Sequence, residues 1–364
     1  MSSSGIQITA FSRAQTEILK GIGILVIVLH NFLHNLTPSI SENQFSFHPE
    51  RFSKFYLTIA DNPFEIIRAS FSYFGHYGVQ IFIFFSAYGL TRKYLDRNIT
   101  TSIFLKGRIG KIYTSFLICV AVYISLGIIK EAYLTSEQVL YWDSLLWKIL
   151  LISSFIPGQG MMPVGPWWFM PFIFQVYLFY PLLIKLFNRF GNSFLILTAI
   201  ASILAEWLLN PYLHKSGLNI NFMIFGHLPV LCAGVYFAAQ DRIRLGYGVI
   251  AASLVLFILG NYNPAIWVLG DLTFTILTLA VSILVVRKGS GSKFLIAPLT
   301  FYGGISFHLF MVNGFLRSPF HNFAETHNVW WIDSLTALAS LIFSTLFAVA
   351  LRTLDKILRK AVAR

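Results

Sequence analysis

Apolar runs of about 20 residues recur from one end of this 364-residue chain to the other. As a helix, each run is long enough to cross a hydrocarbon core of about 30 Å. The runs are continuous rather than alternating, which excludes a membrane β-barrel. Only 12% of the residues are charged, whereas a soluble domain has about a quarter. The sequence therefore predicts an all-α, polytopic membrane helical bundle.

Ten of the apolar runs are predicted to span the membrane. They cover approximately residues 15–36, 65–91, 109–130, 164–187, 193–210, 222–240, 245–261, 265–286, 295–317 and 330–352. A shorter run, 145–156, contains Lys148 and is expected to lie in the interface or to re-enter the bundle. The whole chain, 1–364, is expected to be a single membrane domain with a short basic tail from about residue 353.

Most of the 27 lysines and arginines gather in short loops between the apolar runs. Ten spans would place all of these clusters on one side, and the positive-inside rule makes that side cytoplasmic. Both chain termini would then be cytoplasmic, and the net charge of +12 reports topology rather than nucleic-acid binding. The clusters are Arg13 and Lys20; Arg92, Lys93, Arg97, Lys106, Arg108 and Lys111; Lys185 and Arg189; Arg242 and Arg244; Arg287, Lys288 and Lys293; and Arg352, Lys356, Arg359, Lys360 and Arg364.

The first apolar run carries ionisable side chains that a lipid-facing helix would not tolerate. Lys20 lies near its cytoplasmic entrance, and His30 follows about 15 Å deeper, near the bilayer midplane. An imidazole suits general-base catalysis because it titrates near neutrality. The alternative is that His30 and His34, one helical turn apart, only form hydrogen bonds between helices.

Three cations, Lys106, Arg108 and Lys111, open the third apolar run. They could bind the phosphates of a ligand on the cytoplasmic side, or they could simply anchor the helix. In the second run, Arg68 is expected either to reach the outer surface or to pair with Glu65, three residues away. The two cysteines lie within apolar runs without metal-ligand spacing, and no metal is expected.

Six stretches, in order, resemble the integral-membrane acyltransferase family 3, whose members transfer acyl groups, most often acetyl, to cell-surface sugars. The stretches are EILKGIGILVIVLHNFLHNL, GVQIFIFFSAYGLTRKYLDR, RIGKIY, WFMPFIFQVYLFYPLL, FGHLPVLCAGVYFA and YGGISFHLFMVNGFLR. The resemblance implies an O-acyltransferase of the bacterial cytoplasmic membrane, active in exopolysaccharide biosynthesis. It would use acyl-CoA, typically acetyl-CoA, as co-substrate. Its acceptor would be a surface glycan or a lipid-linked oligosaccharide.

The resemblance also implies roles for individual residues. His30 would be the general base, with Lys20 orienting a substrate and His34 as the alternative base. Lys106, Arg108 and Lys111 would bind the acyl-CoA phosphates. The acceptor pocket would be formed by Asn31, His76, Trp168, Tyr177 and Asn313.

The first helix departs from the family spacing. Lys20 and His30 enclose nine residues, where the family usually has ten. On an ideal helix Asn31 then shares the Lys20 face, His30 lies about 80° away and His34 about 40° away. Two other functions stay open at this point. A transporter or flippase would line a path with the same buried polar groups, and a glycan polymerase would carry larger, arginine-rich outer loops.

Overall fold

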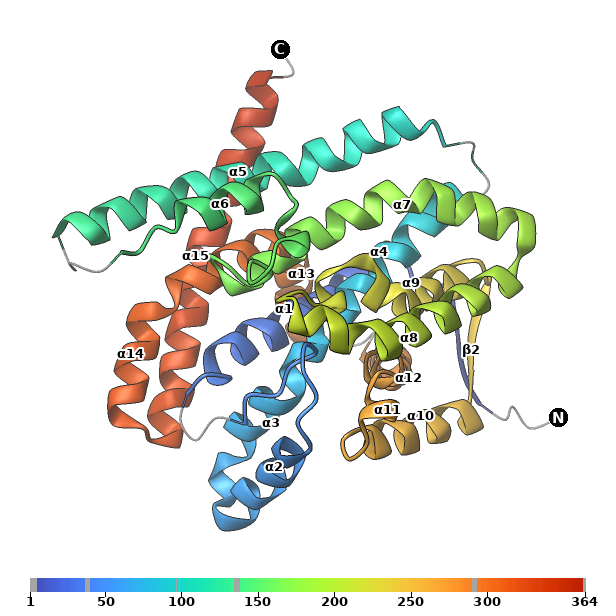
Figure 1. Ribbon diagram of the computed structural model, residues 1–364, viewed down its shortest axis with the longest axis horizontal. Helices are drawn as coiled ribbons and strands as arrows, with labels where there is room; N and C mark the ends of the chain where they lie inside the picture. The colour runs from blue at the N-terminus through green and yellow to red at the C-terminus, as the bar shows by residue number, and fades with distance from the viewer. Residues whose placement is uncertain are drawn as a thin grey trace.

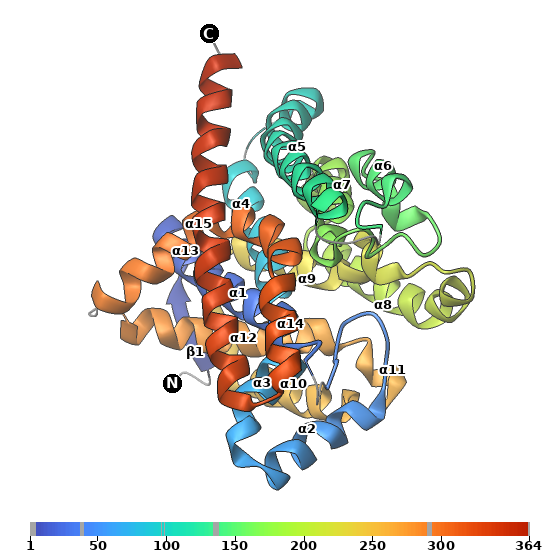
Figure 2. The same cartoon turned by 90° about the vertical axis from the view of Figure 1, so that its left-hand side faces the viewer.

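The computed structural model describes residues 5–36, 40–95, 97, 99–133, 138–289 and 293–362. This part of the chain forms a helical bundle (Figures 1 and 2) in which 82% of the structure is helical. Arg364, in the last basic cluster, lies outside the described residues. The main helices are α1 (Arg13–Leu33), α3 (Ile66–Phe74), α4 (Gly78–Tyr94), α5 (Thr101–Tyr133), α7 (Phe169–Phe190), α8 (Asn192–Lys215), α9 (Ile224–Ala238), α10 (Tyr247–Gly260), α12 (Gly270–Gly289), α13 (Lys293–Leu316) and α15 (Trp330–Val362).

All ten predicted apolar runs are largely helical, and the predicted all-α membrane bundle is confirmed. Among the described residues, seven helical segments are long and apolar enough to cross a membrane. Two further apolar helices, α9 and α10, are shorter. The number of spans and the side of the termini stay predictions. The seven segments are Arg13–Leu33, Thr101–Tyr133, Gly165–Phe190, Asn192–Lys215, Gly270–Arg287, Ile296–Leu316 and Trp330–Ala361.

A small antiparallel sheet, absent from the sequence prediction, joins the N-terminus to the connection between α9 and α10. Strand β1 (Gly5–Thr9) pairs with β2 (Arg242–Gly246), with Gln7 opposite Arg244. Burial alternates along β2, so that Ile243 is buried while Arg242 and Arg244 are exposed. The sheet therefore places the basic cluster of Arg242 and Arg244 at the same end of the molecule as Arg13, which follows β1 at the start of α1.

Short helices occupy the segments between the apolar runs. α2 (Pro49–Asp61) and α14 (Ser318–His327) lie where the sequence indicated loops. α6 (Trp142–Ile149) is only eight residues long, which agrees with the prediction that this region does not span the membrane. Its Lys148 is buried and donates a hydrogen bond to the Gly160 carbonyl at 2.8 Å. α2 and α3 lie at the end of the molecule opposite the C-terminus (Figures 1 and 2).

A buried ion-pair network holds this opposite end together. The Arg68 guanidinium donates to both carboxylate oxygens of Glu65, at 2.6 and 2.7 Å, and to the Asp333 carboxylate of α15. The structure thus confirms the pairing of Arg68 with Glu65 rather than its extension to the surface. Asp333 is the partner that sequence proximity could not reveal, because it lies 265 positions away.

Helix α1 runs through the centre of the bundle, where it packs against α13, α4 and α3. Glycines permit the contact between α1 and α13. A Cβ atom at Gly303 would overlap the Glu17 carbonyl, and one at Gly21 would overlap the Leu299 carbonyl. Both obstacles are backbone atoms, which cannot rotate away as a side chain can. The central pair of helices therefore depends on the absence of side chains at these two positions.

Substituting Gly303→Ala should lower the melting temperature of the purified protein in detergent. The added methyl group must separate α1 from α13, and overpacking of this kind costs about 1–3 kcal/mol. Gly110→Ala is the matched control, because a Cβ atom there meets nothing within 4 Å. Equal melting temperatures for the two variants would show that the α1–α13 contact does not depend on Gly303.

Candidate functional site

A basic cavity of about 700 Å³ lies where α1, α4, α5, α7, α13 and α15 meet. Seven cationic side chains line it, against the two carboxylates of Glu17 and Asp355, so that the cavity attracts anions. The cations come from three basic clusters that are far apart in the sequence. They are Arg13, Lys20, Arg108, Lys111, Arg352, Lys356 and Arg359. We call this space the basic cavity.

Contacts between α5 and α15 assemble one wall of the basic cavity. α5 crosses α15 near the C-terminal end of the chain (Figure 1). There the Arg359 guanidinium donates to the Lys111 carbonyl and, at 3.2 Å, to the Ser115 hydroxyl. Asp355 accepts a hydrogen bond from Arg359 at 2.8 Å, which fixes the guanidinium between the two helices. The C-terminal helix thus contributes directly to this cavity.

A second, smaller cavity of about 170 Å³ is lined by His30, His34 and His76. We call it the histidine cavity. Its wall combines three imidazoles with amide side chains, aromatic rings and one guanidinium, so that it is rich in hydrogen-bonding groups. The polar and aromatic residues that line it are His30, Asn31, His34, Asn35, Asn43, Gln44, Phe45, His76, Trp168, Phe310 and Arg317.

The ring of His30 has a fixed orientation in this cavity. Its Nδ1 lies 2.8 Å from the carbonyl oxygen of Phe71, in α3. A carbonyl can only accept a hydrogen bond, so Nδ1 carries the hydrogen. In the neutral ring Nε2 therefore keeps its lone pair, which is the state a general base requires.

A break in the second apolar run makes room for His30. α3 ends at Phe74, a 3₁₀ turn covers Gly75–Tyr77, and α4 begins at Gly78. A Cβ atom at Gly75 would overlap the His30 side chain, so only glycine permits this approach. The same turn carries His76, whose ring centroid lies 5.7 Å from that of His30. The interruption of this helix thus places two histidines side by side.

Further contacts order the groups around His30. The ring centroids of His30 and His34 are 4.5 Å apart. The Asn31 amide donates to Asn313 Oδ1 at 2.9 Å, which links α1 to α13. Arg317 donates to the Asn31 carbonyl and brings a positive charge to the wall of the cavity.

The loop 40–48 covers the histidine cavity with Asn43, Gln44 and Phe45. The Asn43 side chain accepts hydrogen bonds from the backbone amides of Phe45 and Ser46, which closes a tight turn. Outside the turn, the backbone amide of Ser41 donates to the Ser72 hydroxyl at 3.3 Å. The loop is therefore an ordered cover.

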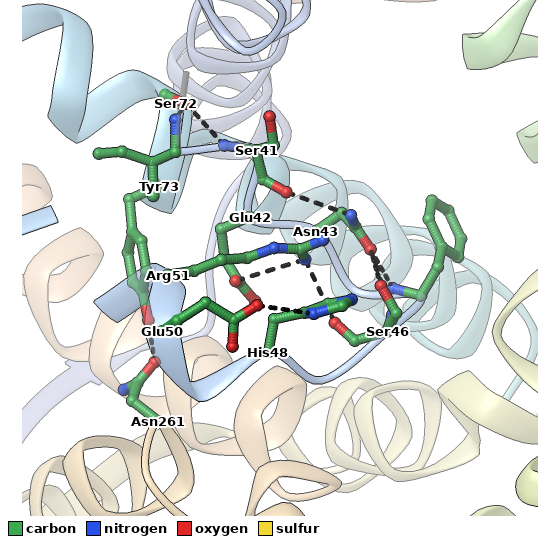
Figure 3. Close-up of polar contacts among 12 residues, drawn as sticks. Ser41, Glu42, Asn43, Ser46, His48, Glu50, Arg51, Ser72, Tyr73 and Asn261 are labelled. Carbon is green, nitrogen blue, oxygen red and sulfur yellow. Dashed lines mark hydrogen bonds and ion pairs between the residues drawn. The ribbon is translucent and has the colours of Figure 1, made fainter. Parts of the chain in front are cut away.

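Two attachments hold this cover in place. Glu42 is buried, and its carboxylate lies 3.6 Å from the guanidinium of Arg51 in α2 (Figure 3). Burial raises the pKa of the Glu42 carboxyl group to about 7 despite this nearby positive charge. On the other side, the Phe45 carbonyl accepts a hydrogen bond from the Asn219 amide at 2.7 Å. Asn221 donates to the Gln44 carbonyl at 2.9 Å.

Three apolar residues line both cavities. They are Ile27 of α1, Val79 of α4 and Phe310 of α13. All three are buried, and because each faces both spaces, the wall between the cavities is one side chain thick. We call these three residues the septum.

The structure distributes the predicted site residues over the two cavities. Lys20, Arg108, Lys111 and Tyr177 line the basic cavity, whereas His30, Asn31, His34, His76 and Trp168 line the histidine cavity. Two predicted site residues lie apart from the groups with which they were expected. Tyr177 lies on the basic cavity rather than with the expected acceptor pocket, and Lys106 is exposed and lines neither cavity. Asn313 lies behind the wall, bonded to Asn31. The chemical roles of all these residues stay predictions.

The structure explains how nine residues, rather than ten, can separate Lys20 from His30 in α1. α1 is one continuous helix from Arg13 to Leu33, without a local irregularity that would realign His30 with Lys20. Lys20 lines the basic cavity and His30 the histidine cavity, so the two side chains need not share one face. His34 shares the second cavity with His30, and the hydrogen bond to Phe71 is the feature that orients His30.

Sequence reasoning missed Arg317, the three cations of α15 and the covering loop. Arg317 had a detectable signal, because an arginine at the predicted outer end of an apolar run opposes the positive-inside rule. From the sequence, the α15 cations served only as an indication of the cytoplasmic side. Residues 43–45 carried no signal, since their position depends on distant partners such as Asn219.

Comparison with known protein families decides between the functions left open by the sequence. The model of acyltransferase family 3, which describes an acyltransferase domain, matches residues 14–353. The chain belongs to this family. It is therefore a multi-pass membrane enzyme that transfers acyl groups. No curated protein and no solved structure matches the chain.

Membership of this family favours the enzyme over the transporter, flippase and polymerase. The match contains all the residues that line the histidine cavity and most of those that line the basic cavity, whereas Arg13, Asp355, Lys356 and Arg359 lie outside the matched range. Among the described residues, no group of three or more His, Cys, Asp or Glu side chains is arranged to hold a metal ion.

Proposed function

We propose that this acyltransferase transfers an acyl group, acetyl in the simplest case, from cytoplasmic acyl-CoA to a sugar hydroxyl. The acceptor would be a surface or exopolysaccharide glycan, or its lipid-linked precursor, at the bacterial cytoplasmic membrane. The observation that carries this proposal is the meeting of a basic cavity and a histidine cavity at a wall one side chain thick.

The basic cavity suits the donor. Coenzyme A carries several phosphate charges, and guanidinium and ammonium groups bind phosphates through charge-assisted hydrogen bonds. A volume of about 700 Å³ lies within the range of small-molecule pockets, about 300–1,000 Å³. With its phosphates near Arg108 and Lys111, the donor would direct its thioester toward the septum.

The histidine cavity suits the acceptor. Its amides, imidazoles and guanidinium offer hydrogen bonds to sugar hydroxyls, and Trp168 offers an apolar surface. His30 Nε2 would remove the proton of the attacking hydroxyl, whose oxygen would bond to the thioester carbonyl carbon. The carbon–sulfur bond would then break, and the proton would pass from His30 to the departing thiolate. The products are an ester and free coenzyme A.

Replacing His30 with alanine, at wild-type expression, should reduce acyl transfer at least about 100-fold, because a positioned general base contributes about 10²–10⁴ to the rate. Transfer of label from radioactive acetyl-CoA to membrane glycan measures this. His327→Ala is the control, since His327 is exposed on α14 and lines neither cavity. Full activity of His30→Ala would remove His30 from the mechanism.

Reversing the charges of Arg108 and Lys111 to glutamate should weaken acetyl-CoA binding at least about tenfold. Each hydrogen bond to a charged group contributes about 1.5–3 kcal/mol, and 1.4 kcal/mol corresponds to a factor of ten. Calorimetry of the purified protein measures the dissociation constant. The matched control reverses Arg242 and Arg244, which are exposed on β2 and line neither cavity. Equal weakening by both pairs would count against a donor site in the basic cavity.

A further inference from the structure

The basic cavity and the histidine cavity share an apolar wall, although the other residues that line them are largely polar. Of the residues that line the basic cavity and the histidine cavity, the three they share are Ile27, Val79 and Phe310. Each comes from a different helix, and each is more than nine-tenths buried. Any group that passes from a donor in one cavity to an acceptor in the other must contact these side chains.

The septum has a regular relation to the polar groups beyond it. Ile27 and Val79 each lie three positions, or about one helical turn, from a histidine that lines the histidine cavity, and Phe310 lies three positions from an asparagine behind the wall of that cavity. Ile27 precedes His30 on α1, and Phe310 precedes Asn313 on α13. Val79 follows His76 across the start of α4. Each of the three helices thus places an apolar residue of the septum close to a polar residue.

Close helix packing fixes the width of the septum. A Cβ atom at Gly78 would lie 2.9 Å from Ile27 Cγ1 and 3.0 Å from the Gly23 carbonyl. α1 and α4 are therefore already at their closest approach beside Ile27 and Val79. A longer acyl group would have to displace the septum side chains or separate α1 from α4, so the side chains of the septum set the space available at this contact.

We propose that Ile27, Val79 and Phe310 form the acyl-selectivity element of the enzyme, which contacts the alkyl part of the donor acyl group and admits short acyl chains in preference to long ones. This inference rests on the proposed function, since it assumes acyl-CoA as the donor. In the reacting state the thioester carbonyl lies at the septum, where the acceptor oxygen attacks it and the carbon–sulfur bond breaks. The alkyl chain packs against the three apolar side chains.

A competition assay tests the proposal. Membranes that contain the native glycan receive acetyl-CoA and butyryl-CoA at equal concentrations, and mass spectrometry measures the ratio of butyryl to acetyl ester on the glycan. This ratio equals the ratio of the two kcat/KM values, so it does not depend on how much protein has folded. The wild type should strongly favour acetyl. Ile27→Ala and Phe310→Ala should raise the ratio at least about tenfold, because methylene groups in a fitted pocket discriminate about 10–200-fold.

Matched controls separate selectivity from general core damage. Ile24→Ala on α1 and Leu309→Ala on α13 remove fully buried side chains that line neither cavity. They should reduce the amount of folded enzyme while leaving the product ratio at the wild-type value. Val79→Ala removes fewer atoms than the other septum variants and should still raise the ratio if those variants fold poorly.

The outcomes distinguish this inference from the function on which it rests. No acyl ester on the glycan with wild-type enzyme and either donor would overturn both. Acetyl transfer by the wild type, with an unchanged product ratio in all three septum variants, would overturn the selectivity element alone. An equal rise of the ratio in Ile24→Ala or Leu309→Ala would do the same, because selectivity would then belong to the core in general.

Discussion

The hydrogen bond between His30 Nδ1 and the Phe71 carbonyl is the contact on which the proposed site depends. It fixes the ring in the cavity and leaves Nε2 with the lone pair. The ring can occupy this place because residue 75 is glycine, where a side chain would overlap His30.

Around this contact, the bundle separates two chemical environments. The basic cavity gathers cations from α1, α5 and α15, while the histidine cavity offers amides, imidazoles and one guanidinium beneath an ordered loop. Ions and sugars could not exchange freely between them, because the septum is apolar and the helices beside it are in close contact. The arrangement would let an acyl group, but not its carrier, meet the acceptor.

Several features of the fold could be predicted from the sequence for definite physical reasons. Continuous apolar runs predict helices, and a histidine within such a run predicts a polar environment. Features that depend on long-range pairing could not be predicted. The basic cavity needs Arg359 beside Lys111, the cover of the histidine cavity needs Asn219 beside Phe45, and the sheet needs Gln7 opposite Arg244. Tyr177 lines the basic cavity and Lys106 lines neither cavity, because a resemblance in sequence identifies a residue but not its neighbours in space.

The most direct test of the account is a structure of the enzyme bound to an analogue of acetyl-CoA in which a methylene group replaces the thioester sulfur. The account predicts phosphates in contact with Arg108 and Lys111, with the ketone carbonyl at the septum near His30. Space for an acceptor oxygen should remain about 3–3.5 Å from the carbonyl carbon on the His30 side. An analogue bound with its ketone outside both cavities, or on a path that avoids the septum, would contradict the account.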